Sequence, residues 1–341
     1  MMASSQPKIS VCIANYNGAE IIRDCLNSVI QQECSEIFEI IVHDDASTDN
    51  SIQIIAEEFP SIHLIASQKN VGYCISNNRM AAAANGDYIL LLNNDATLHD
   101  NALQALMTHA ASYEDIGVLT LPQYCATTHS LLDKGMFIDV FANPIPNTQS
   151  GTREVITVMG SCLWIGRDLW QEIGGFPEWF ESIAEDMYVC CYARLLGRTV
   201  KVIDQSGYDH HVGFSFGGGK AKNNKLITSL KRRRLSERNK SYLIVILFPG
   251  AYPYVILPIH LLLLFIEGFV LAIIKASPRI LIDIYLYSIK SVILNMPKLL
   301  KIRKEVQKKR SKKNGKYWKL INFTPHKLTL LFKYGLPKIV G

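Results

Sequence analysis

Residues 88–95, Tyr-Ile-Leu-Leu-Leu-Asn-Asn-Asp, place three polar side chains directly after a continuous apolar run. A short apolar run bounded by polar residues is typical of a strand that is buried on both faces of a parallel sheet. Open α/β sheets bind their ligands at the carboxyl ends of such strands. One Asp and two Asn at that position offer oxygen ligands for a divalent cation, which would suit a phosphate-bearing substrate.

The charge of the chain is divided unevenly along its length. Residues 1–219 hold 10 Lys/Arg against 26 Asp/Glu, whereas residues 220–341 hold 26 against 4. We therefore expect two parts, an α/β domain over 1–219 and a basic, apolar helical region over 220–341. Because the basic part interleaves its charges with long aliphatic runs, an anionic membrane surface is favoured over nucleic acid as its partner.

Cysteine usage and the N-terminal sequence bear on the compartment. The eight cysteines show no CxxC pair and no metal-ligand spacing, and several lie inside apolar runs. They are therefore expected to be reduced core residues in a reducing compartment. Residues 1–8 lack the basic segment and apolar stretch of a secretory signal, so the acidic part is expected to stay in the cytoplasm.

Strands and helices alternate over the first 120 residues. The apolar patterns predict strands over 9–14, 38–42, 62–66, 87–92 and 116–120, with helices over 19–31, up to residue 59, over 72–84 and from about 101. Ser47 or Thr48 is expected to cap the second helix, and Asp49 is expected to be a cap or turn residue. This alternation predicts an α/β fold, a Rossmann-like, mostly parallel sheet with helices on both faces.

The stretch 121–219 is less regular. The patterns predict a strand over 157–165, a helix over 186–196, a short strand over 199–203 and a loop with Gly and His residues over 207–219. Turn signals interrupt the first part of this stretch. Mixed strands are therefore expected to extend the sheet here.

The basic part contains a long uncharged segment. Residues 241–266 are 26 residues without Asp, Glu, Lys or Arg, long enough to cross a bilayer. Pro249, Pro253 and Pro258 argue against one straight span, and the alternative is a pair of helices embedded in one leaflet and continued by an amphipathic segment over 280–294. Residues 298–313 add nine Lys/Arg against one Glu, and each basic side chain near an anionic leaflet contributes on the order of 1 kcal/mol.

Polar clusters follow several of the predicted strands, and a further acidic pair lies in the second half of the acidic part. In a doubly wound sheet such clusters converge on one crevice. Each cluster alone is weak evidence, because an Asp after a strand is most often a cap or turn residue. The joint pattern is harder to obtain by chance; the clusters are Asn15-Tyr16-Asn17, Asp44-Asp45, Asn93-Asn94-Asp95 and Glu185-Asp186.

Taken in order, these motifs resemble those of family 2 glycosyltransferases over roughly residues 8–240. The closest likeness is to the rhamnosyltransferase-like branch that builds bacterial surface polysaccharides. The motifs are Ile-Ala-Asn-Tyr-Asn-Gly (13–18), Asp-Asp-Ala-Ser-Thr-Asp (44–49), Asn-Val-Gly-Tyr (70–73), Asn77-Asn78-Arg79, Gly-Asp-Tyr-Ile-Leu-Leu-Leu-Asn-Asn-Asp (86–95), Gly-Gly-Phe (174–176), Glu-Asp-Met-Tyr (185–188) and His210-His211.

The resemblance implies a GT-A fold, a nucleotide-diphosphate sugar donor, a divalent metal, Mg²⁺ or Mn²⁺, and inversion at the anomeric carbon. For the donor it favours dTDP-rhamnose or a UDP-sugar. For the acceptor it favours a polyprenyl-diphosphate-linked or surface glycan, such as O-antigen or capsule. The location implied is the cytoplasmic face of the bacterial inner membrane, with the protein either peripheral or held by one membrane-embedded segment.

The resemblance also carries residue roles onto this sequence. Asp95 matches the metal-binding acid of a DXD motif, and His210 or His211 matches a histidine that approaches the metal or the diphosphate. Asp186 matches the general base. This chain departs from the motif because Asn93 stands where its first Asp would be, which leaves one carboxylate. The residues that match positions near the donor are Asn15, Tyr16, Asp44, Asp45, Arg79, Asn93 and Asn94. Of these, Asn93 and Asn94 also lie beside the metal-binding acid.

Elementary chemistry agrees with these roles and leaves some open. An attacking hydroxyl needs one base, for which Asp186 is the candidate. Glu185 either holds an acceptor hydroxyl or is an acid favoured by the helix dipole, and His210-His211 is either functional or a surface turn. A non-catalytic membrane-associated scaffold or sugar-nucleotide-binding protein is the alternative function. A scaffold explains the basic region but not the acids at the strand ends.

Overall fold

The computed structural model describes residues 6–112, 115–151, 154–211, 218–222, 225–311 and 320–340. The chain divides into two compact units. The first, called the α/β unit, comprises residues 1–136, 146–194 and 198–212. The second, called the helical unit, comprises residues 137–145, 195–197 and 213–341.

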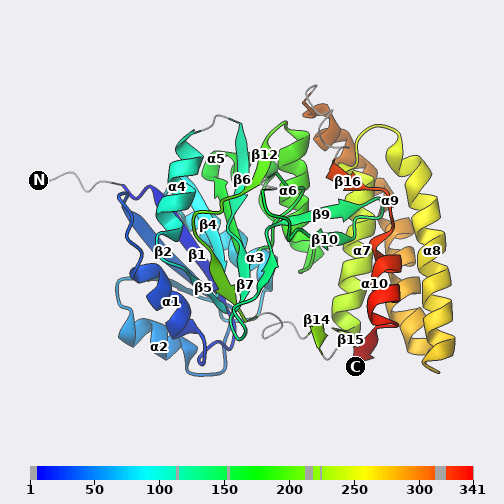
Figure 1. The fold of residues 1–341 in the computed structure, drawn as a ribbon, viewed down its shortest axis with the longest axis horizontal. Coiled ribbons are helices and arrows are strands. Elements are labelled where there is room, and N and C mark those ends of the chain that lie inside the picture. The colour runs from blue at the N-terminus through cyan, green and yellow to red at the C-terminus, as the bar shows by residue number, and fades with distance from the viewer. Residues whose placement is uncertain are drawn as a thin grey trace, which may run out of the picture. The chain divides into compact units, whose positions relative to one another are not determined.

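A seven-stranded sheet forms the centre of the α/β unit (Figure 1). Its first four strands in the sequence are parallel to one another, as the alternating pattern predicts. In spatial order the strands are β12 (Thr199–Val202), β6 (Ile116–Thr120), β11 (Cys162–Gly166), β4 (Tyr88–Asn93), β1 (Ile9–Asn15), β2 (Phe38–Asp44) and β3 (His63–Ala66).

One strand of this sheet differs from the prediction. The strand predicted over 157–165 begins only at Cys162, and Thr157 instead forms an isolated bridge with Met136. β11 lies between β4 and β6 and is antiparallel to both. The less regular stretch therefore inserts a strand into the middle of the sheet, and it also adds β12 at the edge beside β6.

A second sheet of four short strands completes the α/β unit. Its order is β5 (Ala96–Leu98), β13 (Tyr208–His210), β7 (Gln123–Cys125) and β8 (Leu131–Asp133). β13 lies in the stretch predicted as a loop over 207–219, and β14 (Gly218–Lys222) begins inside it, so that prediction is wrong for residues 208–210 and 218–219. Residues 212–217 of the predicted loop lie outside the described residues. Three residues are too few for a periodic pattern, and β13 forms because it pairs with β5 on one side and β7 on the other.

Helices cover both faces of the large sheet. The core on one face joins strand residues such as Val11, Val42 and Leu90 to the buried sides of three helices. Strand residues that alternate with these, such as Cys12 and Leu91, are equally buried, and α3 packs on β1 and β2. The helices are α1 (Ile22–Ile30), α2 (Ser51–Glu58) and α4 (Ala102–Ser112) in that core, with α3 (Tyr73–Ala83), α5 (Arg167–Ile173), the 3₁₀ turn η1 (Glu178–Phe180) and α6 (Glu185–Leu195) elsewhere.

The helical unit is built around long helices (Figure 1). Two helical stretches, Tyr252–Ile274 and Ile280–Lys308, are long and apolar enough to cross a membrane by length and composition. The elements are α7 (Leu230–Leu247), α8 (Tyr252–Ile274), the π-helical turn η2 (Ile280–Leu286), α9 (Tyr287–Lys308) and α10 (His326–Tyr334), with short strands β9 (Met136–Asp139), β10 (Pro144–Pro146), β14 (Gly218–Lys222), β15 (Lys225–Ser229), β16 (Ile321–Asn322) and β17 (Lys338–Val340).

The uncharged segment 241–266 is divided between two helices. α7 ends at Leu247 and α8 begins at Tyr252. The Arg303 guanidinium donates hydrogen bonds to the carbonyl oxygens of Val245 (2.8 Å) and Phe248 (2.7 Å), which are among the groups a helix end leaves without partners. The first part of the segment is therefore buried protein core, and only α8 continues as a long apolar helix.

The cysteines behave as expected. All eight are free; six are buried, and Cys34 and Cys125 are half-buried. Burial raises the pKa of the Cys162 thiol to about 12. The Cys162 thiol therefore stays protonated and behaves as a small apolar side chain.

Candidate functional site at the carboxyl ends of the parallel strands

The sheet register brings three of the predicted polar clusters together. Asn15, Asp44 and Asn93 are the last residues of β1, β2 and β4. Asn15 is directly opposite Asp44, and Ala14 is opposite Asn93. Because β1 lies between the other two strands, the clusters form one continuous group at the carboxyl edge of the sheet, as the sequence predicts.

Asn15 is the centre of a buried hydrogen-bond network. Its side-chain amide donates to the Asp44 carboxylate (2.7 Å), and its side-chain oxygen accepts a hydrogen bond from the Asn94 amide (2.8 Å). Ser47 completes the network by donating its hydroxyl to Asp44 at 2.6 Å. Asn15, Asp44 and Asn94 are all buried. The network therefore fixes the backbone of three strand ends relative to one another.

The residues expected to cap α2 have other partners. Ser47 accepts a hydrogen bond from the Asn17 N–H (2.8 Å), and no side chain caps the helix at Asn50. The cap prediction for Ser47 and Thr48 is thus wrong, because the strand-end network binds Ser47. Asp49 is a turn residue: its carboxylate accepts the N–H of Ser51 (3.0 Å) and also that of Ala19 (2.9 Å).

Asp45 holds the loop that leads into α3. Its two carboxylate oxygens accept the N–H groups of Val71 (2.6 Å) and Gly72 (2.8 Å). Gly72 has φ +90°, which favours glycine, and α3 begins at the next residue. Asp45 therefore shapes the backbone where helix α3 starts.

Arg79 and Tyr16 are the exposed members of the predicted donor set. Arg79 donates to the Ser67 hydroxyl (3.0 Å) and lies 3.3 Å from the His43 ring nitrogen Nε2. Burial lowers the pKa of His43, and the Arg79 charge lowers it further, against the opposing effect of Asp45. A neutral His43 accepts the hydrogen bond from Arg79. Tyr16, which follows Asn15 of the buried network in the sequence, is 51% exposed.

Asp95 lies in the turn after β4 and contacts His210. Ala96 of β5 is paired with His210 of β13, and this register places the His210 Nε2 atom 3.0 Å from Asp95 Oδ1. Both side chains are buried. His211 contributes its main-chain N–H to the Asp95 carbonyl oxygen (2.9 Å), and its side chain is exposed. Of the predicted pair, His210 is thus the residue whose ring meets Asp95.

Asp186 is held at the start of α6. Its Oδ2 atom accepts the N–H of Gly160 (3.0 Å), and its Oδ1 atom accepts that of Met187 (2.6 Å). The Tyr73 hydroxyl lies 3.1 Å from the Gly160 carbonyl oxygen and 3.0 Å from Asn93 Oδ1. Tyr73 and Gly160 therefore connect Asp186 to the end of β4. Glu185 is buried beside it in the first turn of the helix.

Sequence reasoning assigned no role to Tyr73, Gly160 or Asp133. Tyr73 follows Gly72 at a helix start, and burial, reinforced by the charges of Glu185 and Asp186, raises the pKa of its phenol, which keeps it a hydrogen-bond donor. Burial raises the pKa of Asp133 on β8 to about 7, against the opposing N–H of Gly135 and the charge of His210. No periodic signal marks these positions, since their roles depend on contacts between distant segments.

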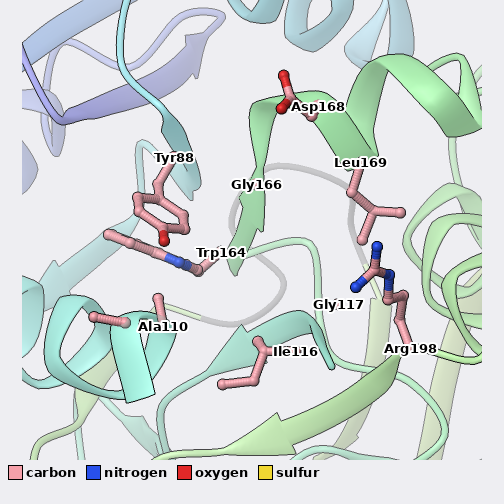
Figure 2. A pocket seen from close by; sticks show the side chains of 10 residues that line it. Tyr88, Ala110, Ile116, Gly117, Trp164, Gly166, Asp168, Leu169 and Arg198 are labelled. Atoms are coloured by element: carbon pink, nitrogen blue, oxygen red, sulfur yellow. The ribbon is translucent and has the colours of Figure 1, made fainter. Parts of the chain in front are cut away.

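A surface hollow of about 390 Å³ lies elsewhere on the same unit. Figure 2 shows its lining, with Tyr88 and Trp164 on one side and Leu169 and Arg198 on the other. Tyr88 is the first residue of β4, whereas Asn93 is the last. The hollow is therefore at the end of β4 opposite the polar group and is distinct from the candidate site.

Comparison with known proteins shows which families and folds this chain resembles. Residues 10–172 match the family described as "Glycosyl transferase family 2". The uncharacterized glycosyltransferase YibD of Escherichia coli (strain K12) is 36% identical over 112 residues, which are 32% of this chain and 32% of that protein. The O-antigen biosynthesis protein RfbC of Myxococcus xanthus is 23% identical over 222 residues, 60% of this chain and 17% of that protein. The matches span about a third of the length of the first curated relatives.

Solved structures share the fold. S. aureus TarS 1-349 in complex with UDP superposes with a TM-score of 0.56 at 19% identity, covering 91% of this chain and 89% of that one. GalNAc-T7 with UDP, GalNAc and Mn²⁺ gives a TM-score of 0.59 at 12% identity, covering 87% of this chain and 58% of that one. At these identities the likeness concerns the fold alone.

The sheet order and the polar group at its carboxyl edge define an α/β protein with a GT-A-like fold. Residues 10–172, somewhat less than half of the chain, resemble glycosyltransferase family 2. Asp186 and His210 lie beyond this matched stretch, so their candidacy depends on the hydrogen bonds that connect them to Asn93 and Asp95.

Proposed function

We propose that this protein is an inverting glycosyltransferase that moves a sugar from a nucleotide-diphosphate donor to a glycan acceptor. The observation that carries the proposal is the arrangement at the carboxyl edge of the sheet. There the Asp95–His210 pair and the Asp186 carboxylate are tied to one strand end by hydrogen bonds through Tyr73 and Asn93. An acid for a metal and a separate base are the two groups that sugar transfer from a diphosphate needs.

A divalent metal fits the residues present if the donor supplies part of its coordination. Among the described residues no three His, Cys, Asp or Glu side chains form a metal cluster. Asp95 Oδ1 and His210 Nε2 lie 3.0 Å apart, a spacing that suits neighbouring ligands with bonds of about 2.1 Å. Mg²⁺ is commonly bound through one or two carboxylates together with substrate phosphates. Asp95 and His210 would hold Mg²⁺ or Mn²⁺, which neutralises charge on the leaving diphosphate.

The other side chains act on the donor and the acceptor. Asp186 takes the proton of the acceptor hydroxyl as that oxygen attacks the anomeric carbon and the bond to the diphosphate breaks. Two main-chain N–H groups, from Gly160 and Met187, orient its carboxylate. Because a single displacement takes place, the anomeric centre inverts. Tyr16 and Arg79, the exposed members of the donor set, are available to the nucleotide.

We propose a bacterial surface-glycan substrate and a membrane location for the reaction. The donor is dTDP-rhamnose or a UDP-sugar, and UDP is present in the TarS and GalNAc-T7 structures that share the fold. The acceptor is a polyprenyl-diphosphate-linked glycan, in keeping with the O-antigen role named for RfbC. The location is the cytoplasmic face of the inner membrane, and the two apolar helices of the helical unit support attachment to a membrane.

A thermal-shift screen tests the donor and the metal together. The full chain is heated with UDP-, dTDP- and GDP-sugars, each with and without Mn²⁺. We expect one donor class to raise the melting temperature in a Mn²⁺-dependent way, since ligand at about 100 times its Kd stabilises a protein by about 2.7 kcal/mol. Asp95→Ala should lose the Mn²⁺-dependent part of the shift. A wild-type protein that no nucleotide sugar stabilises would contradict the proposal.

A further inference from the structure

The outward side of α8 is unusual for a surface helix. Eleven large apolar side chains between Tyr254 and Ile274 are at least 43% exposed, and the one charged residue of this stretch, Glu267, is half-buried. A helix that faces water normally carries charged residues on its outer face. A continuous exposed apolar surface of this length marks an interaction surface. The residues are Tyr254, Val255, Ile259, Leu262, Leu263, Phe265, Ile266, Phe269, Val270, Ile273 and Ile274.

The inward side of α8 carries its polar groups. Glu267, the one charged residue of the helix, accepts hydrogen bonds from Arg233 of α7 (2.5 Å) and Lys327 of α10 (2.7 Å). Lys327 also pairs with the fully buried Glu237 (2.9 Å). These ion pairs fix the rotation of α8 about its own axis, so the apolar side stays turned away from α7 and α10.

α8 cannot separate from its neighbours easily. A Cβ atom on Gly268 would lie 2.6 Å from the Tyr285 ring, so the helix approaches η2 as closely as a glycine permits. Any membrane position of α8 therefore carries η2 and α9 with it. These neighbours have exposed charges, among them Asp283, Lys290 and Lys298. A helix of 23 residues is about 35 Å long, enough to cross a bilayer, yet crossing would bring these charges into the hydrocarbon.

The charges around α8 select the kind of membrane. Residues 275–311 hold ten lysines and arginines against two acidic residues. On α9 the exposed Lys290 alternates with exposed apolar residues such as Ile293 and Leu294, and Lys298, Lys301 and Lys304 follow. Apolar residues beside lysines suit the boundary between acyl chains and anionic headgroups. A second copy of this chain is disfavoured as the partner, because the lysines of the two α9 helices would repel each other.

We propose that α8 lies in the plane of one leaflet of an anionic bilayer, with its outer face among the acyl chains and the lysines of α9 at the headgroups, and does not cross. This inference rests on the membrane location in the proposed function and specifies its geometry. The helical unit is then a one-sided anchor, and the charged cluster around Glu267 remains inside protein.

Vesicle co-sedimentation tests the surface. The full chain is mixed with phosphatidylcholine vesicles with and without phosphatidylglycerol. We expect sedimentation with the anionic vesicles, and at least about a tenfold loss for the double variant Leu262→Asp/Phe269→Asp. Ile37→Asp changes a similarly exposed apolar residue of the α/β unit and is the matched control. It should sediment like wild type. Equal sedimentation of wild type and the double variant, or sedimentation of neither, would overturn the proposal.

Fluorescence quenching distinguishes lying in the leaflet from crossing it. Tryptophan replaces Tyr254, Phe265 or Ile273, near the start, middle and end of the exposed side of α8, and lipids brominated at different depths quench it. The proposal predicts one common depth for the three positions, measured against the unsubstituted protein. A deep middle with two shallow ends indicates a crossing helix and overturns it. Donor-induced thermal shifts of the same variants are read separately, so failure of sugar binding is not mistaken for failure of the anchor.

Discussion

Replacing Asn15 by alanine should destabilise the α/β unit strongly. The change removes a hydrogen bond to the buried Asp44 carboxylate (2.7 Å) and one from Asn94 (2.8 Å). A hydrogen bond to a charged group contributes about 1.5–3 kcal/mol and a neutral one about 0.5–1.5 kcal/mol. Because both partners are left buried, we expect a loss of about 2–4 kcal/mol.

Thermal unfolding of the full chain, followed by circular dichroism, measures this loss. For a unit of about 200 residues, 1 kcal/mol shifts Tm by roughly 2–4 °C. Asn15→Ala should therefore lower the Tm of the α/β unit by about 5–15 °C. Asn27→Ala is the matched control, because Asn27 is exposed on α1 and its change should stay within about 0.5 kcal/mol. A shift for Asn15→Ala no larger than that of the control would refute the view that this network fixes the strand ends.

Two further predictions concern residues that the structure adds to the site. Tyr73→Phe removes the hydroxyl that lies between Asn93 and Gly160. Because this loosens the position of Asp186, the rate of sugar transfer should fall about tenfold while the donor-induced thermal shift stays unchanged. A lowered donor affinity with an unchanged rate would speak against this role. Burial raises the pKa of Asp133 in the folded protein to about 7, above its unfolded value, so the folded state loses stability as the pH rises toward 7. In urea unfolding, the free energy of unfolding of Asp133→Asn should therefore rise by about 1–3 kcal/mol relative to wild type between pH 5 and pH 8. A difference between the two proteins that does not change with pH would contradict the assignment.

Local sequence patterns predict the parallel half of the large sheet well. β4 is a continuous apolar run that ends in a polar residue, and β1 and β2 are mostly apolar and end in polar residues as well. Such runs identify both the strand and its carboxyl end. The grouping of Asn15, Asp44 and Asn93 follows from topology once the strands are parallel. These are the features for which information within a few residues is enough.

Other features depend on pairing between distant segments. β11 is antiparallel because of its place between β4 and β6, which its own five residues do not reveal. Strand β13, and with it the choice of His210 over His211 as the partner of Asp95, depends on pairing with β5. The division of the segment 241–266 depends on Arg303, which lies more than 50 residues away from the carbonyl groups it binds.

We propose that Asp186 is the base of a metal-assisted sugar transfer. The direct measurement is the transfer of a radiolabelled sugar from the donor found by thermal shift to a bacterial lipid extract, by wild type and by Asp186→Asn. We expect a rate at least about 100-fold lower for the variant, since general-base catalysis contributes about 10²–10⁴-fold, with the donor-induced thermal shift retained. Near wild-type transfer by Asp186→Asn would contradict it.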